Sequence, residues 1–151
     1  VQVEYITPEG DFTGFNAPDR AKEIADSMID GGADVIYHAA GGSGLGLFQA
    51  AQEGGIWAIG VDSDQYFTAS DFQDVILTSM LKPVDGAVYD AIAAQCDGTF
   101  EGGTRILDLE AGGVGYSTSG GYVDDIVDQL EDFKAQIIAG DIEVPTVPEA
   151  G

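Results

Sequence analysis

The chain has 151 residues, 44% of them hydrophobic, which is long and apolar enough for one globular domain with a core. Its formal net charge is -22, from 27 acidic and 5 basic residues, so binding of nucleic acid by charge is excluded and anionic ligands are disfavoured. The acids are scattered along the chain, a pattern typical of a halophilic surface, with an ordinary acidic protein as the alternative.

Short apolar runs alternate with amphipathic segments that begin at prolines or polar caps and end at glycines. In chain order, we expect a strand at 1–7, a helix at 18–30, a strand at 34–38, a helix at 44–53, a strand at 56–61, a strand at 75–79, a helix at 84–96, a strand at 102–109, a helix at 123–139 and an extended tail at 142–148. This alternation predicts an α/β fold with a doubly wound parallel sheet in three layers. Residues 1–151 are expected to form a single domain.

The helix at 84–96 carries a row of apolar residues that we expect to face inward: Val84, Ala87, Val88, Ala91 and Ile92. Cys96 lies in the same apolar stretch, and we expect it to be buried. A single cysteine excludes an internal disulfide and a multi-cysteine metal site.

A glycine-rich turn after the second strand is the most informative motif. Residues 37–46 (YHAAGGSGLG) lead from a strand into a helix, and Asp62 follows the next strand in GVDSDQ. Ligands of open α/β sheets bind beyond the carboxyl ends of the strands, and both loops lie at such ends. The turn offers bare backbone and Asp62 offers a carboxylate, which together predict a site for a small polar ligand.

Chemistry other than binding is less well supported. The spacing G-G-x-G-x-G differs from the dinucleotide motif G-x-G-x-x-G, so an NAD-dependent oxidoreductase domain stays as an alternative, as does simple close packing of the glycines. Asp62 and Asp64 would suit a metal, a helix cap or a solvated turn, but no further ligand cluster accompanies them. His38 is expected to hydrogen-bond to a loop. We expect no cofactor, no metal and no catalysis.

Two further residues lie at the same expected edge of the sheet. Lys82, at a strand-to-helix junction, is either an ordinary surface lysine or a contact to a ligand or to Asp62. Phe15, in the first loop, either packs in the core or projects to stack on a flat ligand.

Three segments carry a resemblance to a known family. Asp34–Ala51, Trp57–Gln65 and Thr78–Tyr89 resemble the basic membrane protein (Bmp) family, the substrate-binding components of ABC importers. Members are often lipoproteins, and several bind purine nucleosides. The resemblance implies a type I periplasmic-binding-protein-like fold of two lobes, of which this chain corresponds to the C-terminal one.

The resemblance also implies a site, a location and partners. The ligand-binding residues would be Phe15, Ala40, Gly41, Asp62 and Lys82, with Phe15 stacking on the base and Asp62 and Lys82 binding ribose hydroxyls. Because the loop before Phe15 is long, Phe12 is the substitute for it. The partners would be a purine nucleoside and a transporter permease. The protein would be extracellular, held at the membrane only by a lipid anchor on an N-terminal part absent from this chain. A ligand-sensing domain of a regulator shares this fold and is a third possibility.

Overall fold

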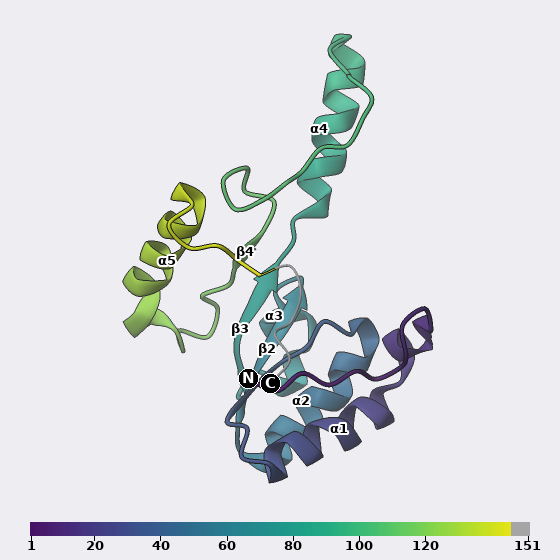
Figure 1. The fold of residues 1–151 in the computed structure, drawn as a ribbon, viewed down its shortest axis with the longest axis vertical. Helices are drawn as coiled ribbons and strands as arrows, with labels where there is room; N and C mark the ends of the chain where they lie inside the picture. Colours follow the sequence, from purple (N-terminus) through teal and green to yellow (C-terminus); the bar gives the residue numbers. More distant parts are fainter. Residues whose placement is uncertain (146–151) are drawn as a thin grey trace.

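The computed structural model describes residues 1–145, which contain a four-stranded sheet in the order β1-β2-β3-β4 (Figure 1). The first three strands are parallel, and β4 is antiparallel to β3. The strands are β1 (Val35–Tyr37), β2 (Trp57–Asp62), β3 (Ile76–Leu81) and β4 (Gly115–Tyr116). The α-helices are α1 (Pro18–Asp30), α2 (Gly44–Gly54), α3 (Gln65–Thr68), α4 (Val84–Asp97) and α5 (Val127–Ala139), and η1 (Phe12–Asn16), η2 (Gly41–Ser43), η3 (Ser70–Phe72) and η4 (Asp124–Ile126) are 3-10 turns.

The core lies between the sheet and the helices α1 and α2. Phe48 of α2, Ile76 of β3 and Ala58 of β2 are completely buried in it. The two helices approach closely because α2 carries Gly46, where a Cβ atom would collide with the Pro18 carbonyl of α1. The α2 helix ends at Gly55, whose φ of 67° provides the left-handed C-cap that glycine adopts without strain. With α5 on the other side of the sheet, the three-layer α/β prediction is confirmed (Figure 1).

The expected strand at 1–7 is wrong. The segment has the alternating pattern of a strand, but within residues 1–145 its backbone makes no hydrogen bond, and it lies across α1 as an irregular chain. A strand exists only when another strand pairs with it. Here β1 is hydrogen-bonded to β2 alone, and its other edge does not reach Val1–Thr7.

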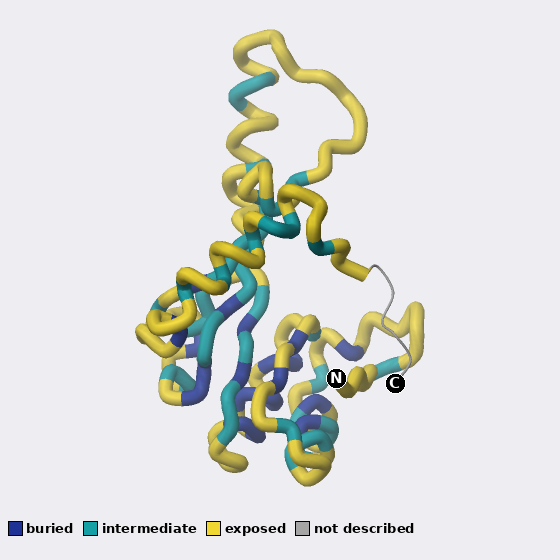
Figure 2. Tube along the Cα trace, turned by 60° about the vertical axis from the view of Figure 1, so that its left-hand side comes forward, coloured by how far each residue is buried: buried dark blue, intermediate teal, exposed yellow. Residues whose placement is uncertain are grey.

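The helix predicted at 84–96 is present as α4, but the prediction that its apolar residues face inward is wrong. No residue of α4 is buried, and the helix stands away from the body (Figures 1 and 2). Val88 and Ile92 are 58% and 59% exposed, and Cys96, expected to be buried, is exposed too. The amphipathic pattern is real, yet no other element of residues 1–145 covers its apolar side.

The strand expected at 102–109 is also wrong: these residues are irregular and lead back from α4 to the body. The chain rejoins the sheet only at β4. The expected helix at 123–139 begins with η4 and becomes α-helical at Val127. Of the expected extended tail, residues 142–145 are without regular structure, and the remainder lies outside the described residues.

Candidate ligand-binding site

The glycine-rich turn after β1 is built mainly by packing. Ser43 is completely buried; its hydroxyl donates to the Gly14 carbonyl at 2.6 Å and accepts from the Ala17 N–H at 2.7 Å. These bonds fasten the η1 loop to the start of α2. A Cβ on Gly44 would collide with the His38 ring, just as one on Gly46 would collide with α1. Close packing therefore explains Gly44 and Gly46, and the exposed Gly41, with its φ of 54°, remains available to a ligand.

Asp62 and Lys82 meet at the carboxyl ends of β2 and β3. The Lys82 Nζ lies 2.6 Å from the Asp62 Oδ1, and the Lys82 N–H donates to the Asp62 carbonyl at 2.9 Å. The Lys82 side chain is 49% exposed and the Asp62 side chain is 52% exposed. An ion pair so open to water contributes at most about 1 kcal/mol, so a ligand hydroxyl can insert at little cost. The pair presents a hydrogen-bond acceptor and a donor side by side.

Asp62 is held in an unusual backbone conformation. Its φ of 67° is the one positive value at a non-glycine residue in the described part of the chain. Such a conformation costs on the order of 1 kcal/mol and occurs preferentially at ligand-binding positions, although Asp and Asn tolerate it best. The surrounding structure must therefore fix the loop that presents this carboxylate.

A partly buried hydrogen-bond network beneath Asp62 provides that fixation. The Gln65 Oε1 accepts from the Val61 N–H at 2.8 Å and lies 2.9 Å from the His38 Nε2, and the Gln65 N–H donates to the Ser79 hydroxyl at 3.1 Å. Since the Gln65 oxygen is an acceptor, the His38 Nε2 is the donor. His38 thus makes a side-chain hydrogen bond as expected, but its partner is the first residue of α3 and not a loop residue.

The other His38 ring nitrogen, Nδ1, is buried and has no hydrogen-bond partner among residues 1–145. The ring lies edge-on to Phe48, with the centroids 5.2 Å apart. Burial lowers the pKa of His38, against smaller raising effects from the hydrogen bond to Gln65 and from the Asp62 carboxylate. His38 is therefore neutral at pH 7 and acts as a support for the site.

Tyr37 is a site residue that the sequence analysis missed. Burial and the Asp62 carboxylate raise the pKa of its phenol, and Lys82 partly opposes them. Its side chain is about half exposed. The sequence signal for Tyr37 was its position at the end of a strand, directly before His38. Because neighbouring side chains of a strand point to opposite faces of the sheet, a buried His38 implies that Tyr37 points to the other face.

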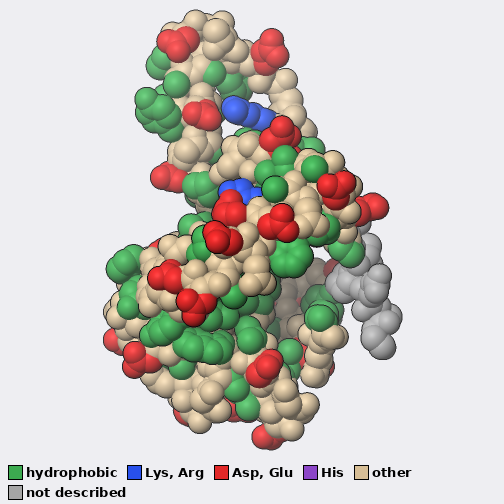
Figure 3. All heavy atoms as spheres, turned by 90° about the vertical axis from the view of Figure 1, so that its left-hand side faces the viewer, with side chains coloured by type: hydrophobic (Ala, Val, Ile, Leu, Met, Phe, Trp, Pro, Cys, Tyr) green, Lys and Arg blue, Asp and Glu red, His purple; other side chains and the backbone are tan. Residues whose placement is uncertain are grey.

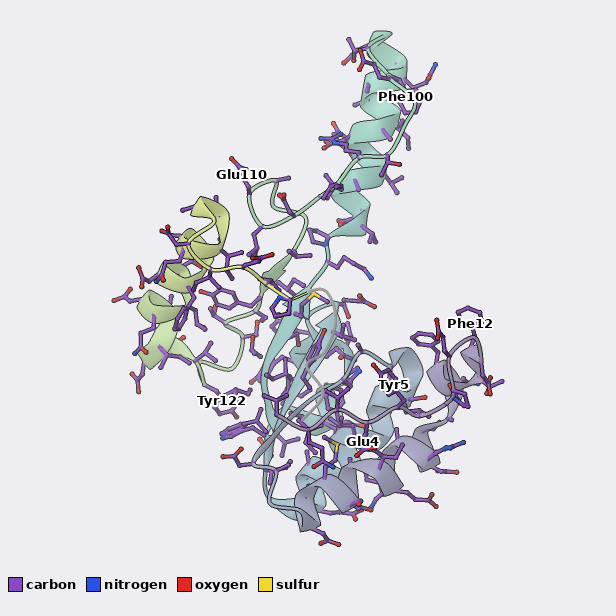
Figure 4. All side chains as sticks on the ribbon, viewed as in Figure 1. Glu4, Tyr5, Phe12, Phe100, Glu110 and Tyr122 are labelled. Carbon is purple, nitrogen blue, oxygen red and sulfur yellow. The ribbon has the colours of Figure 1, made fainter. Side chains whose placement is uncertain are left out.

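The predicted site residues fall into two groups. Phe15 lies against Gly41, where an added Cβ would be 3.3 Å from the Phe15 Cδ1. Phe15 and Ala40 also line one end of a cavity of about 1000 Å³, which neither Asp62 nor Lys82 lines. Phe15 is 52% exposed, whereas Phe12 is 77% exposed at the outer end of η1 (Figure 4). The structure thus brings Phe15, Ala40 and Gly41 together, and separately Asp62 and Lys82.

Asp64 has a structural role. Its carboxylate accepts from the hydroxyls of Ser117 at 2.9 Å and Ser119 at 2.7 Å, and from the Tyr66 N–H at 3.3 Å at the start of α3. These bonds tie the chain that returns from α4 to the sheet. Within residues 1–145, no three His, Cys, Asp or Glu side chains gather as metal ligands. The helix-cap interpretation therefore accounts for Asp64.

Comparison with known proteins settles the family. The model of the Bmp family, described as ABC transporter substrate-binding protein PnrA-like, matches residues 11–147. The chain belongs to the Bmp family. The resemblance seen in the sequence is thereby confirmed, and no finding supports the oxidoreductase alternative.

The relatives of this Bmp-family chain are longer than it is. A CD4+ T-cell-stimulating antigen of Listeria monocytogenes is 40% identical, over 89% of this chain and 42% of the relative. An ABC transporter nucleoside-binding protein, BmpA of Lactococcus lactis, is 34% identical, over 87% and 42%. A solved ABC transporter solute-binding protein from Aeropyrum pernix K1 superposes with a TM-score of 0.68 at 29% identity, over 90% and 46%. The chain thus spans less than half the length of each.

Proposed function

We propose that residues 1–151 form the C-terminal lobe of a two-lobed substrate-binding protein that captures a purine nucleoside for an ABC importer. The observation that carries this proposal is the Asp62–Lys82 pair, half exposed at the carboxyl edge of the sheet. An acceptor and a donor side by side match the two neighbouring hydroxyls of a ribose. Hydrogen bonds from charged groups contribute roughly 1.5–3 kcal/mol each.

The chemistry of the flanking residues supports the same ligand. Phe15, half exposed against Gly41, offers an aromatic face on which a base could stack, for roughly 1–3 kcal/mol. Ala40 and Gly41 offer backbone groups next to it. A net charge of -22 repels a nucleotide phosphate but has no such effect on a neutral nucleoside. The BmpA relative is itself named as nucleoside-binding.

The shape of the chain supports a second lobe. α4 is joined to the body by Lys82–Pro83 on one side and by residues 98–114 on the other, and its apolar side, with Val88 and Ile92, is exposed. A helix held in this way is suited to packing on a separate lobe. Closure of two lobes around the ligand would remove water from the Asp62–Lys82 pair and strengthen its hydrogen bonds.

We place the protein at the outer face of the cell membrane, held by a lipid anchor, with a permease as its partner. Relatives named as lipoproteins in Pyrococcus species support this location. In residues 1–145, no helix is long and apolar enough to cross the bilayer.

The test is calorimetric titration of the two-lobed protein with adenosine, guanosine, inosine and adenosine monophosphate. We expect micromolar binding of at least one nucleoside and at least tenfold weaker binding of the nucleotide. The 151-residue chain alone should bind only at millimolar strength, because it supplies one wall of the cleft. A two-lobed protein that binds no nucleoside, or a single lobe that binds as tightly as the whole, would refute the proposal.

A further inference from the structure

Asp62 lies at the centre of a tight turn at the end of β2. The Ser63 N–H donates to the Val61 carbonyl at 2.8 Å, which closes a three-residue γ-turn around Asp62. With a φ of 67° at its central residue, this is the rare and strained kind of γ-turn. Strained backbone persists only where the surrounding structure holds it in place. The bonds that hold this turn therefore determine where the Asp62 carboxylate points.

Two hydrogen bonds reach the turn from outside it. The Lys82 N–H donates to the Asp62 carbonyl at 2.9 Å, and the Val61 N–H donates to the Gln65 Oε1 at 2.8 Å. The first bond joins two main-chain groups at the end of the sheet, whereas the second depends on a side chain. Within residues 1–145, Gln65 is the one residue whose side chain hydrogen-bonds to the backbone of Val61, Asp62 or Ser63. The turn thus depends on the identity of residue 65.

The surroundings of Gln65 fix the orientation of its amide. The Gln65 Oε1 also lies 2.9 Å from the Nε2 of His38, and the Gln65 N–H donates to the hydroxyl of the completely buried Ser79. Gly60 leaves room for this arrangement, because a Cβ there would lie 2.8 Å from the Gln65 Oε1 and 2.6 Å from the Ser79 Oγ. A flipped amide would turn its NH₂ group toward two donors, the Val61 N–H and the His38 ring. Only the oxygen fits this position.

We infer that Gln65 is the positioning residue of the ligand site: its amide oxygen holds the strained turn at Val61 and thereby fixes the Asp62 carboxylate beside Lys82. This inference rests on the nucleoside site proposed above. Gln65 acts on the ligand through Asp62 and not by contact. Without its hydrogen bond the turn relaxes, and the carboxylate loses its orientation. Gln65 therefore contributes to affinity only in a protein that has the Asp62 carboxylate.

Calorimetric titration of the two-lobed protein with adenosine, guanosine and inosine tests this dependence. Gln65→Met removes the acceptor at similar side-chain length, and we expect the tightest of the three nucleosides to bind about tenfold more weakly. Asp62→Gly removes the carboxylate and adopts a positive φ without strain. Adding Gln65→Met to Asp62→Gly should weaken binding by less than about twofold, because both changes remove the same contribution. Parental affinity of Gln65→Met, or full additivity of the two changes, refutes the inference.

Gln73→Met is the matched control for that titration. Gln73 is also half-buried, and its Nε2 donates to the Tyr66 carbonyl at 2.8 Å, a bond that does not involve the turn. We expect Gln73→Met to bind nucleosides like the parent. A loss of affinity equal to that of Gln65→Met would show a general effect of lost hydrogen bonds and would refute the positioning role.

Amide hydrogen exchange without ligand separates this inference from the nucleoside function. The Lys82 amide is bonded to the Asp62 carbonyl, and we expect it to exchange at least about tenfold faster in Gln65→Met than in the parent. The Ala58 amide, bonded to the Val75 carbonyl near the start of β2, should be unchanged. Unchanged Lys82 exchange refutes the inference. If no nucleoside binds but Lys82 exchange responds as expected, the nucleoside function alone fails.

A second variant keeps the test decisive if Gln65→Met does not fold. Gln65→Glu retains an oxygen acceptor for the Val61 N–H and the His38 Nε2–H. We expect parental Lys82 exchange and an affinity within about threefold of the parent. A loss of protection or of affinity by tenfold or more in Gln65→Glu would show that the acceptor at residue 65 does not hold the turn, and would overturn the inference.

Discussion

Asp62 combines a left-handed backbone with an exposed ion pair, and its side chain can be changed without breaking the loop. We expect Asp62→Asn in the two-lobed protein to weaken nucleoside binding at least tenfold, equivalent to about 1.4 kcal/mol, because the amide lacks the charge that strengthens its bonds to hydroxyls. Asparagine also tolerates a positive φ, so the unfolding temperature without ligand should change little. Asp74→Asn removes the same charge from an exposed acid with no side-chain hydrogen bond or ion pair in residues 1–145, and should bind like the parent. Equal affinities of all three by calorimetry would remove Asp62 from the site.

His38 predicts a pH dependence of stability. Burial lowers its pKa in the folded protein below the ordinary value of about 6.5. The unfolded chain therefore binds more protons below that pH, and stability should fall as the pH drops from about 6.5 toward the lowered value. Thermal unfolding between pH 7.5 and 5.5 should show this loss in the parent and a smaller one in His38→Gln, whose amide can still donate to Gln65. If the unfolding temperatures of the two proteins fall in parallel with pH, the loss of stability is not due to His38. The range from pH 7.5 to 5.5 lies above the pH at which carboxylates ordinarily titrate.

At the scale of elements, the exposed apolar side of α4 predicts that one substitution will change the stability of the 151-residue chain and of the two-lobed protein by different amounts. Ile92→Asp should leave the 151-residue chain within about 0.5 kcal/mol of the parent, since Ile92 is 59% exposed there. In the two-lobed protein, where we propose that this side is covered, it should cost at least about 1.5 kcal/mol. Tyr89→Asp is the matched control, because Tyr89 is 72% exposed on the same helix and lies outside the apolar groove that Ile92 lines. Chemical denaturation of all six proteins gives the comparison, and an equal cost of both changes in the two-lobed protein would count against a buried Ile92.

The sequence predicts elements well where their partners are local. The three parallel strands and the helices α1, α2 and α4 lie within a few residues of their expected ends, because caps, glycines and apolar periodicity are encoded nearby. The predictions for Val1–Thr7 and for the inward side of α4 were wrong for one shared reason: no element of residues 1–145 pairs with the first segment or covers the second. For the site, the ends of β2 and β3 predicted the meeting of Asp62 with Lys82. The contribution of Tyr37 and the support from Gln65 depend on side-chain directions that no motif encodes.

At the scale of the whole molecule, the charge predicts a response to salt. Acidic side chains are spread over the surface among very few basic ones (Figure 3). Raising the ionic strength shortens the screening length from about 10 Å at 0.1 M to about 3 Å at 1 M, which removes their mutual repulsion. We expect the unfolding temperature to rise between about 0.1 M and 3 M KCl. Changing the exposed Asp74, Asp97 and Glu143 to their amides should reduce that rise, and a midpoint that stays flat or falls would contradict a halophilic surface.

The two connections of α4 also determine where a protease can act. Trypsin cleaves after Lys and Arg, and this chain has only five such residues, so the possible first cuts are few. Arg20, Lys22 and Lys134 lie within helices, and Lys82 precedes Pro83, a bond that trypsin resists. Arg105 lies in the irregular segment that returns from α4, with a side chain 69% exposed. Brief digestion of the 151-residue chain should therefore give the fragments 1–105 and 106–151 first, and packing of a second lobe around α4 should slow that cut.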